Sequence, residues 1–356
     1  MNVYAGHGSP DFNQSLHLEL VSITADIAAV LGTSMEALVL GGGYGRGEGG
    51  VVEVDRVQVP YNDLDLFLFV KPGALPGFRA LPSVLEPHAR RLGIHVDVSR
   101  PIRLDEIRRW SPALMWLDLL EGHKVLAGPA DTLTSRAPAW LGRPLPPIEA
   151  MRLLLNRGAG LLWSMRIVRD LEMPPDPEFV RRNAYKAALA LGDALLILHQ
   201  RYRSKCEGRD LLFQTLADEV FEVGALDVVG YHREGLAFKF RPDRASRLAW
   251  SSSDLDALCG AFVRVFRAVE PRCHDVTPGD PALAKAPGAP FALQDCRLRR
   301  QLRHAVQNLR HGRLSLRSPR NRLYQGLPQL LAPSAFDGKT WPAKSSVWLD
   351  DWRLTL

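Results

Sequence analysis

The sequence contains little cysteine, no long apolar run and no leader-like N-terminus. Its four cysteines lie far apart, without the paired spacing that zinc binding or redox chemistry requires: Cys206, Cys259, Cys273 and Cys296. Scattered thiols of this kind are typical of reduced cysteines in a cytoplasmic protein. No run reaches the roughly eighteen apolar residues of a membrane span. The first residues also lack the basic start and apolar core of a signal peptide. We therefore expect a cytoplasmic protein that has no membrane segment.

Positive and negative charges are nearly balanced over most of the chain. The 356 residues carry a formal net charge of +6, but one stretch holds nine arginines and neither lysine nor acid: Arg297, Arg299, Arg300, Arg303, Arg310, Arg313, Arg317, Arg320 and Arg322. Without these nine, 36 basic residues face 39 acidic ones. The segment Arg297–Arg322 is therefore where an anionic partner such as RNA would be held. A solvated face, or packing against acids elsewhere in the chain, is the alternative interpretation.

Two proline-rich stretches divide a chain that is long enough for two domains. Five prolines fall within residues 129–147 and five within residues 271–290, as expected of linkers. Strand and helix patterns mix before the first stretch, whereas helical periodicity dominates after it. We expect an α/β (α+β) chain with a small mixed β-sheet, organised as a head at 1–130, a linker at 131–147, an all-helical domain at 148–270, a proline-rich linker at 271–290 and an arginine-rich C-terminal segment at 291–356.

Apolar periodicity also predicts the individual elements. In the first part we expect helices at 11–31, 78–92 and 104–110, strands at 37–40, 63–70 and 94–99, and an inserted arm between Gly49 and Pro60. The stretch 113–127 fits a helix or a strand. In the second part we expect helices at 148–170, 180–202, 211–221 and 253–269, and an irregular C-terminus that bears Trp341, Trp348 and Trp352.

The most informative stretch is a glycine-dense turn followed by alternating acids. Gly41, Gly42 and Gly43 follow an apolar strand, and Asp63-Leu64-Asp65-Leu66 opens the next one. Successive side chains of a strand point to opposite faces, so Asp63 and Asp65 emerge on the same face. Two neighbouring carboxylates repel each other unless a cation lies between them. Beside a turn whose backbone amides can approach a phosphate, the expected cation is magnesium.

This order of elements resembles the nucleotidyltransferase superfamily, the fold of DNA polymerase beta, kanamycin nucleotidyltransferase and the CCA-adding enzymes. Its signature is an apolar residue and a glycine pair, then acid-apolar-acid-apolar, then a third acid on a neighbouring strand. Gly41-Gly42, or Gly42-Gly43, matches the first part, Asp63 and Asp65 match the second, and Asp97 matches the third. The match covers residues 11–130 and departs from the pattern in the long gap between Gly43 and Asp63.

The resemblance implies a reaction and its site residues. The chain would move a nucleoside monophosphate, AMP from ATP in the first instance, to an acceptor hydroxyl of a small molecule, a protein or an RNA end, with release of pyrophosphate. Asp63 and Asp65 would hold two magnesium ions, with manganese as the alternative ion, and Asp97 would complete one of the two metal sites. Gly41, Gly42, Gly43 and Arg46 would bind the phosphates, while Glu48 would pair with Arg46 and shape the turn.

Two cations of the helical domain are further candidates for nucleotide binding. In this superfamily a lysine of the second domain commonly reaches the triphosphate, and Lys186 is the candidate here, with Arg157 as a second. Lys186 shares a helical face with Asp193, seven residues on. A salt-bridged lysine between packed helices is an equally good interpretation of Lys186.

Two other functions remain open. A degenerate site on the same fold would make the chain a non-catalytic nucleotide-binding or interaction protein. Arg299 and His304 also have the Arg-x4-His spacing of a family of helical ribonucleases, a short pattern that arises easily by chance in so basic a stretch.

Overall fold

The computed structural model describes residues 3–73, 76–273, 320–336 and 338–353, and single helical positions at 302, 305, 306 and 309. The chain forms two compact units. The head consists of residues up to Leu145 together with two later segments, Arg203–Arg209 and Leu236–Ala245. The helical unit comprises Pro146–Tyr202, Asp210–Gly235 and the chain from Ser246 onward. The expected α+β class, with a small mixed sheet and a separate all-helical part, is confirmed.

The head is built on a four-stranded mixed sheet in the order β5-β4-β1-β6. Its strands are β1 (Met35–Leu40), β4 (Leu64–Val70), β5 (Val96–Val98) and β6 (Lys124–Ala127). β1 pairs antiparallel with β4 and β6, whereas β4 pairs parallel with β5. The stretch 113–127, which fitted either a helix or a strand, contains both: α4 (Leu114–Glu121) precedes β6.

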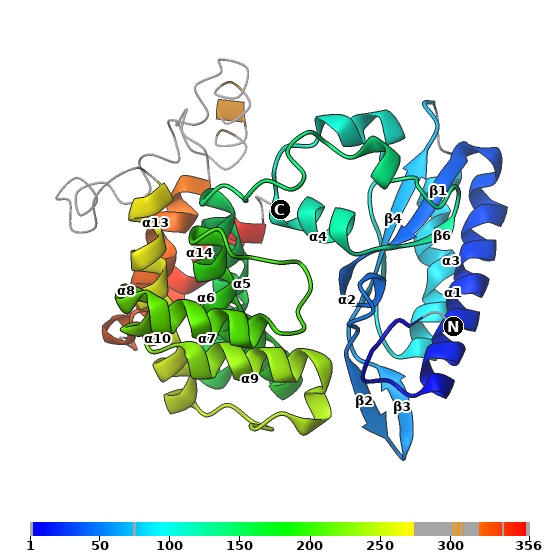
Figure 1. The fold of residues 1–356 in the computed structure, drawn as a ribbon. Coiled ribbons are helices and arrows are strands. Elements are labelled where there is room, and N and C mark those ends of the chain that lie inside the picture. The colour runs from blue at the N-terminus through cyan, green and yellow to red at the C-terminus, as the bar shows by residue number, and fades with distance from the viewer. Residues whose placement is uncertain are drawn as a thin grey trace. The chain divides into compact units, whose positions relative to one another are not determined.

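Helices cover both faces of this sheet (Figure 1). On one face, α1 (Pro10–Leu31) and α3 (Leu81–Leu92) bury leucines and isoleucines against Leu38, Leu64 and Leu66. On the other face, α4 and the 3-10 helix η3 (Leu104–Arg109) pack on a smaller core that includes Val39 and Phe69. The core is thus split into two layers by one sheet, and β1 and β4 contribute alternate side chains to the two layers.

α1 corrects one expectation about apolar runs. Residues Pro10–Ser34 are long and apolar enough, by length and composition, to cross a membrane. The core helix of a globular protein passes the same test, and α1 buries a stripe of side chains in the head at helical spacing: Phe12, Leu16, Leu20, Ile23, Ile27 and Leu31.

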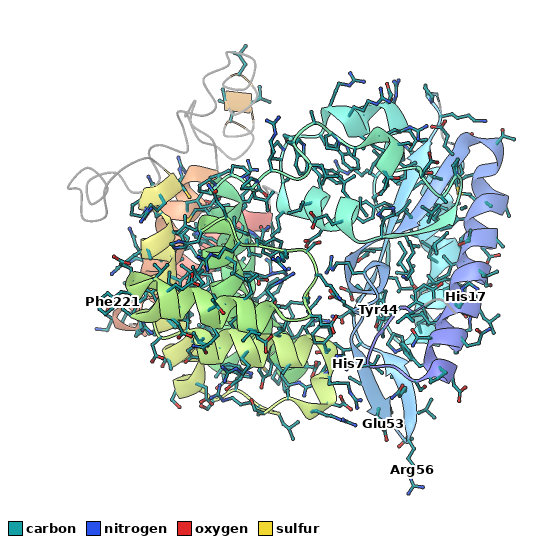
Figure 2. All side chains as sticks on the ribbon, viewed as in Figure 1. His7, His17, Tyr44, Glu53, Arg56 and Phe221 are labelled. Carbon is teal, nitrogen blue, oxygen red and sulfur yellow. The ribbon has the colours of Figure 1, made fainter. Side chains whose placement is uncertain are left out.

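The long gap between the glycines and Asp63 is a β-hairpin. β2 (Val51–Val54) pairs antiparallel with β3 (Val57–Pro60). Asp55 and Arg56 both have positive φ at its tip, as a two-residue hairpin turn requires, and Arg56 extends from the tip (Figure 2). The expected inserted arm is confirmed. The glycine run itself contains a one-turn helix, α2 (Gly42–Gly45).

The helical unit is centred on two long antiparallel helices, α5 (Ile148–Val168) and α6 (Pro177–Leu198). Among the described residues, the other helices after α6 are α7 (Arg209–Glu219), α8 (Phe221–Gly224), α9 (Val229–Phe240), α10 (Ser252–Val269), α13 (Arg320–Leu331) and α14 (Trp341–Arg353). The first residue of α7 and the last turn of α9, from Leu236, belong to the head. The expectation of an irregular tryptophan-bearing C-terminus is wrong, because α14 is helical. Its Trp348 Nε1 donates to Leu323 O at 3.1 Å and Trp341 Nε1 donates to Leu330 O at 2.9 Å.

The division into units differs from the expected domain boundaries in two places. Much of the expected linker 131–147 is packed on the head, where Leu133 is fully buried, and the head also takes up two segments from within the helical sequence. Most of the arginine-rich stretch lies outside the described residues, as do residues 274–290 of the second proline-rich stretch. Arg299 and His304, the ribonuclease-like pair, are among the residues outside this description.

Candidate functional site

β4 separates its apolar and acidic side chains by strand alternation. Leu64, Leu66 and Leu68 are buried in the core beneath α1 and α3. Asp65 and Phe67 therefore point to the opposite face. There Phe67 packs at the edge of the core beneath α4, while Asp65 is exposed. Asp65 thus lies near the beginning of β4, just before the part of that face that is covered by apolar side chains.

Asp65 and Asp97 are register partners on neighbouring parallel strands. Partner residues on adjacent strands lie about 4.8 Å apart along the hydrogen-bonding direction and project to the same face. Asp97 is exposed on β5, the edge strand of the sheet. Asp63 immediately precedes β4, whose pairing with the β5 side begins where Leu64 N donates to His95 O at 3.0 Å. The structure therefore brings the two strand acids side by side and places the third one step before the strand.

The glycine turn lies directly against Asp65. Gly41 N donates to Asp65 O at 2.8 Å. Gly42 has a φ of +61°, and a Cβ built on it would come within 2.1 Å of Asp65 Oδ2. A side chain at this position would both strain the backbone and displace the carboxylate. Gly42 is glycine because the turn must pass this close to Asp65.

Tyr44 joins the two ends of the hairpin behind the site. Its buried hydroxyl donates to Gly50 O at 2.7 Å and accepts from Tyr61 N at 3.0 Å. Asn62 Oδ1 accepts from Gly50 N at 2.9 Å. Burial raises the pKa of Tyr44, and the charge of Asp63 raises it further. The hairpin is thus closed at its base, so that Asp63 enters β4 in a fixed register despite the long insertion.

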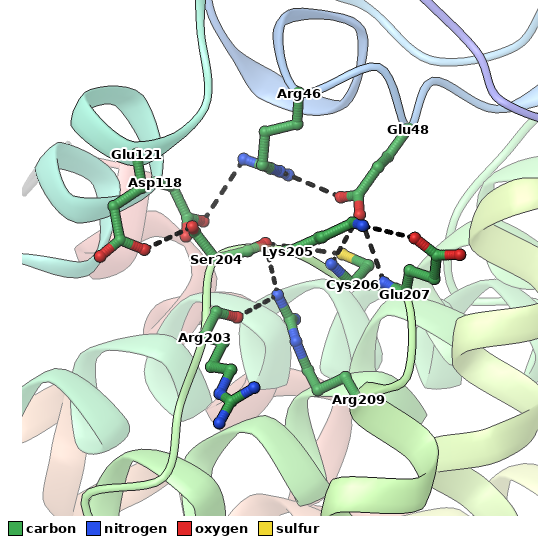
Figure 3. A network of polar contacts seen from close by, with 10 residues as sticks. All are labelled: Arg46, Glu48, Asp118, Glu121, Arg203, Ser204, Lys205, Cys206, Glu207 and Arg209. Atoms are coloured by element: carbon green, nitrogen blue, oxygen red, sulfur yellow. Dashed lines mark hydrogen bonds and ion pairs between the residues drawn. The ribbon is translucent and has the colours of Figure 1, made fainter.

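Arg46 and Glu48 form a buried ion pair instead of an open phosphate contact. Arg46 Nε donates to Glu48 Oε2 at 3.3 Å, and Arg46 Nη1 lies 3.7 Å from Asp118 Oδ2 of α4 (Figure 3). The Arg46 side chain is 11% exposed. The expected Arg46–Glu48 pair is present, but the guanidinium is engaged by two carboxylates. Its environment favours holding the turn on α4 over the expected role in binding phosphate.

Glu48 also fixes a segment that is remote in the sequence. Its Oε1 accepts from Cys206 N at 2.7 Å and from Glu207 N at 3.2 Å (Figure 3). Nearby, Ser204 Oγ donates to Glu121 Oε2 at 2.6 Å. Arg209 folds back on the segment and donates to the carbonyl oxygens of Arg203 and Ser204 at 2.6 and 2.7 Å. One buried carboxylate thus connects the glycine turn to Arg203–Arg209.

The oxygen donors at this end of the sheet suit a hard divalent cation. Asp65 and Asp97 are exposed neighbours, and no ion pair in the described part of the chain involves Asp63 or Asp97. Among the described residues, however, no three His, Cys, Asp or Glu side chains are grouped so that they could hold a metal ion. The structure thus shows two neighbouring carboxylates, Asp65 and Asp97, with Asp63 as the next acid, just before the strand.

The two candidate cations of the helical unit occupy different environments. Arg157 lies exposed on α5, and Lys186 is half-buried on α6. Asp193, which the helical spacing placed on the face of Lys186, contacts the buried His232, whose Nε2 lies 3.1 Å from Asp193 Oδ1. A nucleotide-binding role for Lys186 and Arg157 remains a prediction.

Several residues around the site were not singled out by the sequence. Tyr44 lies within the glycine run, and an aromatic side chain among glycines is a sequence feature that could have pointed to its structural role. Asp118 and Ser204 lack such a signal, because their contacts with the glycine turn and with Glu121 are set by tertiary packing.

Comparison with known proteins adds no assignment. No model of a known protein family matches the chain, and no curated protein is significantly similar to it.

Proposed function

We propose that this chain is a metal-dependent nucleotidyltransferase. It moves a nucleoside monophosphate, AMP from ATP, to an acceptor hydroxyl and releases pyrophosphate. The observation that carries the proposal is the register of Asp65 with Asp97, with Gly42 against the Asp65 carboxylate. These features combine a carboxylate pair with a turn that lacks side chains, and such a surface suits a phosphate group held next to divalent ions.

Each residue has a defined part in this proposal. Asp65 and Asp97, with Asp63, would hold the divalent ions, which when bound neutralise charge on the phosphates and lower the pKa of an acceptor hydroxyl. Gly42 leaves the space beside the Asp65 carboxylate free of a side chain, and Gly41 joins the turn to β4 by donating its N–H to Asp65 O. Asp97, which is exposed on the edge strand, would accept the proton of the acceptor hydroxyl.

The test is release of pyrophosphate from each nucleoside triphosphate with magnesium, across a panel of acceptors that includes RNA ends. We expect wild-type activity with ATP and a loss of about 100-fold or more in Asp65→Asn and Asp97→Asn, the magnitude typical when an electrostatic contact to the reacting group is removed. Asp55→Asn is the matched control, because Asp55 is an exposed acid at the hairpin tip with positive φ, which asparagine also tolerates.

Equal activity in wild type and both site variants would refute the proposal. A specific observation favours a second candidate, a non-catalytic nucleotide-binding protein: no three-acid group in the described residues is arranged as a ligand set. That candidate predicts ATP binding by calorimetry with no pyrophosphate released under any condition, and binding that survives Asp97→Asn.

A further inference from the structure

A hollow with charged side chains in its wall lies on the head, away from the carboxylate site. It has a volume of about 590 Å³ and is lined by Glu36, Val70, Pro72, Arg103, Leu104, Asp105, Arg108 and Arg136. β4 begins beside Asp65 and ends at Val70. Five residues of strand at about 3.3 Å each separate Asp65 from Val70 by about 17 Å. The hollow is therefore a separate feature at the opposite end of β4.

The charges in the hollow leave a positive subsite. Arg103 donates two hydrogen bonds of 2.9 Å to the Asp105 carboxylate, from Nε and Nη2. Arg109 Nη2 donates to the same carboxylate at 3.2 Å. Two guanidiniums thus more than neutralise Asp105, and the hydrogen bond from Arg103 holds the pKa of that carboxyl below its ordinary value. The other carboxylate of the lining is Glu36, and the same lining also contains Arg108 and Arg136, two positive charges for this one acid.

Arg136 is held in place within the lining. Its Nη1 donates to Thr132 O at 3.2 Å and to Ser135 Oγ at 3.0 Å. Arg108 is exposed, and no ion pair in the described part of the chain involves it. A guanidinium presents five N–H donors in a planar fork that matches a phosphate, so both arginines have donors to offer to a ligand.

We propose that this hollow binds the phosphate monoester of a small hydroxyl-bearing molecule, such as a sugar phosphate or a mononucleotide. Arg108 and Arg136 bind the phosphate, and Glu36 accepts hydrogen bonds from hydroxyl groups. Val70, Pro72 and Leu104 supply the apolar part of the wall. The volume is in the range of small-molecule sites, about 300–1,000 Å³, and a single hollow suits a small ligand better than a long polyanion, which needs an extended basic stripe.

The experiment measures binding to the full chain by calorimetry with AMP, ribose 5-phosphate, inorganic phosphate and adenosine. We expect AMP or ribose 5-phosphate to bind and adenosine to bind at least tenfold more weakly. Arg108→Ala and Arg136→Ala should each weaken the phosphate ester by about tenfold, the loss of one charged hydrogen-bonded contact. Asp65→Asn separates this site from the carboxylate site and should leave the affinity unchanged.

Arg90→Ala is the matched control, because Arg90 is an exposed arginine of the head on α3. Thermal melting of each variant checks that it is folded, and Arg108 is exposed, so its replacement should leave the melting temperature unchanged. The proposal is overturned if no phosphate ester binds, if binding is lost in Asp65→Asn but kept in Arg108→Ala and Arg136→Ala, or if single-stranded RNA alone binds. Equal binding of inorganic phosphate and the esters would overturn the assigned role of Glu36.

Discussion

Gly42 and Gly93 share a backbone conformation but not an environment. Gly42 has φ +61° and would carry a Cβ 2.1 Å from Asp65 Oδ2, whereas Gly93 has φ +68° with no atom within 4 Å of such a Cβ. Gly93 ends α3 in the left-handed conformation, where glycine is preferred for its backbone alone. A comparison of the two positions therefore separates the cost of backbone strain from the cost of contact with Asp65.

Alanine at Gly93 should lower the free energy of unfolding by about 1 kcal/mol, the usual cost of a left-handed L-residue. Alanine at Gly42 should cost more, and should also lower pyrophosphate release by tenfold or more, because the Asp65 carboxylate must move. Urea unfolding and the activity assay measure the two effects. Equal destabilisation by the two variants, with activity retained in both, would contradict the close approach of the turn to Asp65.

Glu48 is the second residue whose role depends on contacts remote in the sequence. We expect Glu48→Ala to lower the free energy of unfolding by about 3 kcal/mol, because it leaves a buried guanidinium with one carboxylate fewer and two backbone N–H groups without an acceptor. Glu48→Gln keeps one acceptor oxygen and should cost less. The measurement is urea unfolding.

Glu207→Ala is the matched control for Glu48, because Glu207 lies in the same segment but its side chain is 74% exposed in a surface pair with Lys205. It should change stability far less than Glu48→Ala does, because surface ion pairs contribute little. Similar losses in the Glu48 and Glu207 variants would show that Glu48 does not hold the segment.

Among the elements, α1 and α3 are joined by a polar clamp as well as by apolar packing. The buried His88 lies 2.5 Å from Glu19 through Nδ1 and 2.8 Å from Asp26 through Nε2, and Arg91 Nη2 donates to Glu19 at 2.7 Å. Burial tends to raise the pKa of Glu19, but hydrogen bonds from Arg91 and His88 together lower it below 4.5. The ionised carboxylate is thus the form that the clamp stabilises.

This shift predicts a pH dependence. A carboxyl whose pKa is lower in the folded than in the unfolded state stabilises the fold above the unfolded value, and the contribution is lost as the pH falls through the folded value. Glu19→Gln should therefore be less stable than wild type at pH 7, by about 1 kcal/mol, because Glu19 is partly exposed and its partner Arg91 is 53% exposed. The difference should shrink as the pH falls below about 4.5. Chemical unfolding between pH 2 and 7 measures it, and a constant difference over that range would contradict the clamp.

For the whole molecule, the chain order does not match the division into units. The head is completed by Arg203–Arg209 and Leu236–Ala245, which lie within the helical sequence. Phe238 packs on Tyr61 at 5.6 Å between ring centroids, and Phe240 packs on His7 at 5.0 Å. These residues belong to the head in spite of their position in the sequence.

A protein truncated after Leu145 should therefore be less stable than the head within the full chain. It retains the whole sheet but loses the partners of Glu48 and the aromatic cover of Tyr61. We expect its melting temperature, measured by circular dichroism, to fall by several degrees. Alternatively, the truncated protein exposes apolar surface and aggregates, which dye binding measures. A truncated protein that melts at the temperature of the full chain's head would show that the two returning segments contribute little.

The sequence alone determined those features that depend on neighbours along the chain. Strand alternation placed Asp65 opposite Leu64 and Leu66, the long gap before Asp63 indicated an inserted arm, and helical periodicity marked α1, α5, α6 and α10 within a few residues. Local sequence also split strand from helix in the head well enough to predict its mixed sheet. These are short-range effects, set by side-chain periodicity and backbone preference.

Only the tertiary structure decided which distant groups meet. Strand pairing set Asp65 beside Asp97, a contact that the spacing of the acids did not fix. Packing surrounded Arg46 with two carboxylates, because a guanidinium removed from water must find acceptors wherever the fold supplies them. The same requirement brought Glu48 to the backbone of Cys206, 158 residues later in the chain. Burial and charge pairing act through space, so a linear pattern does not record them.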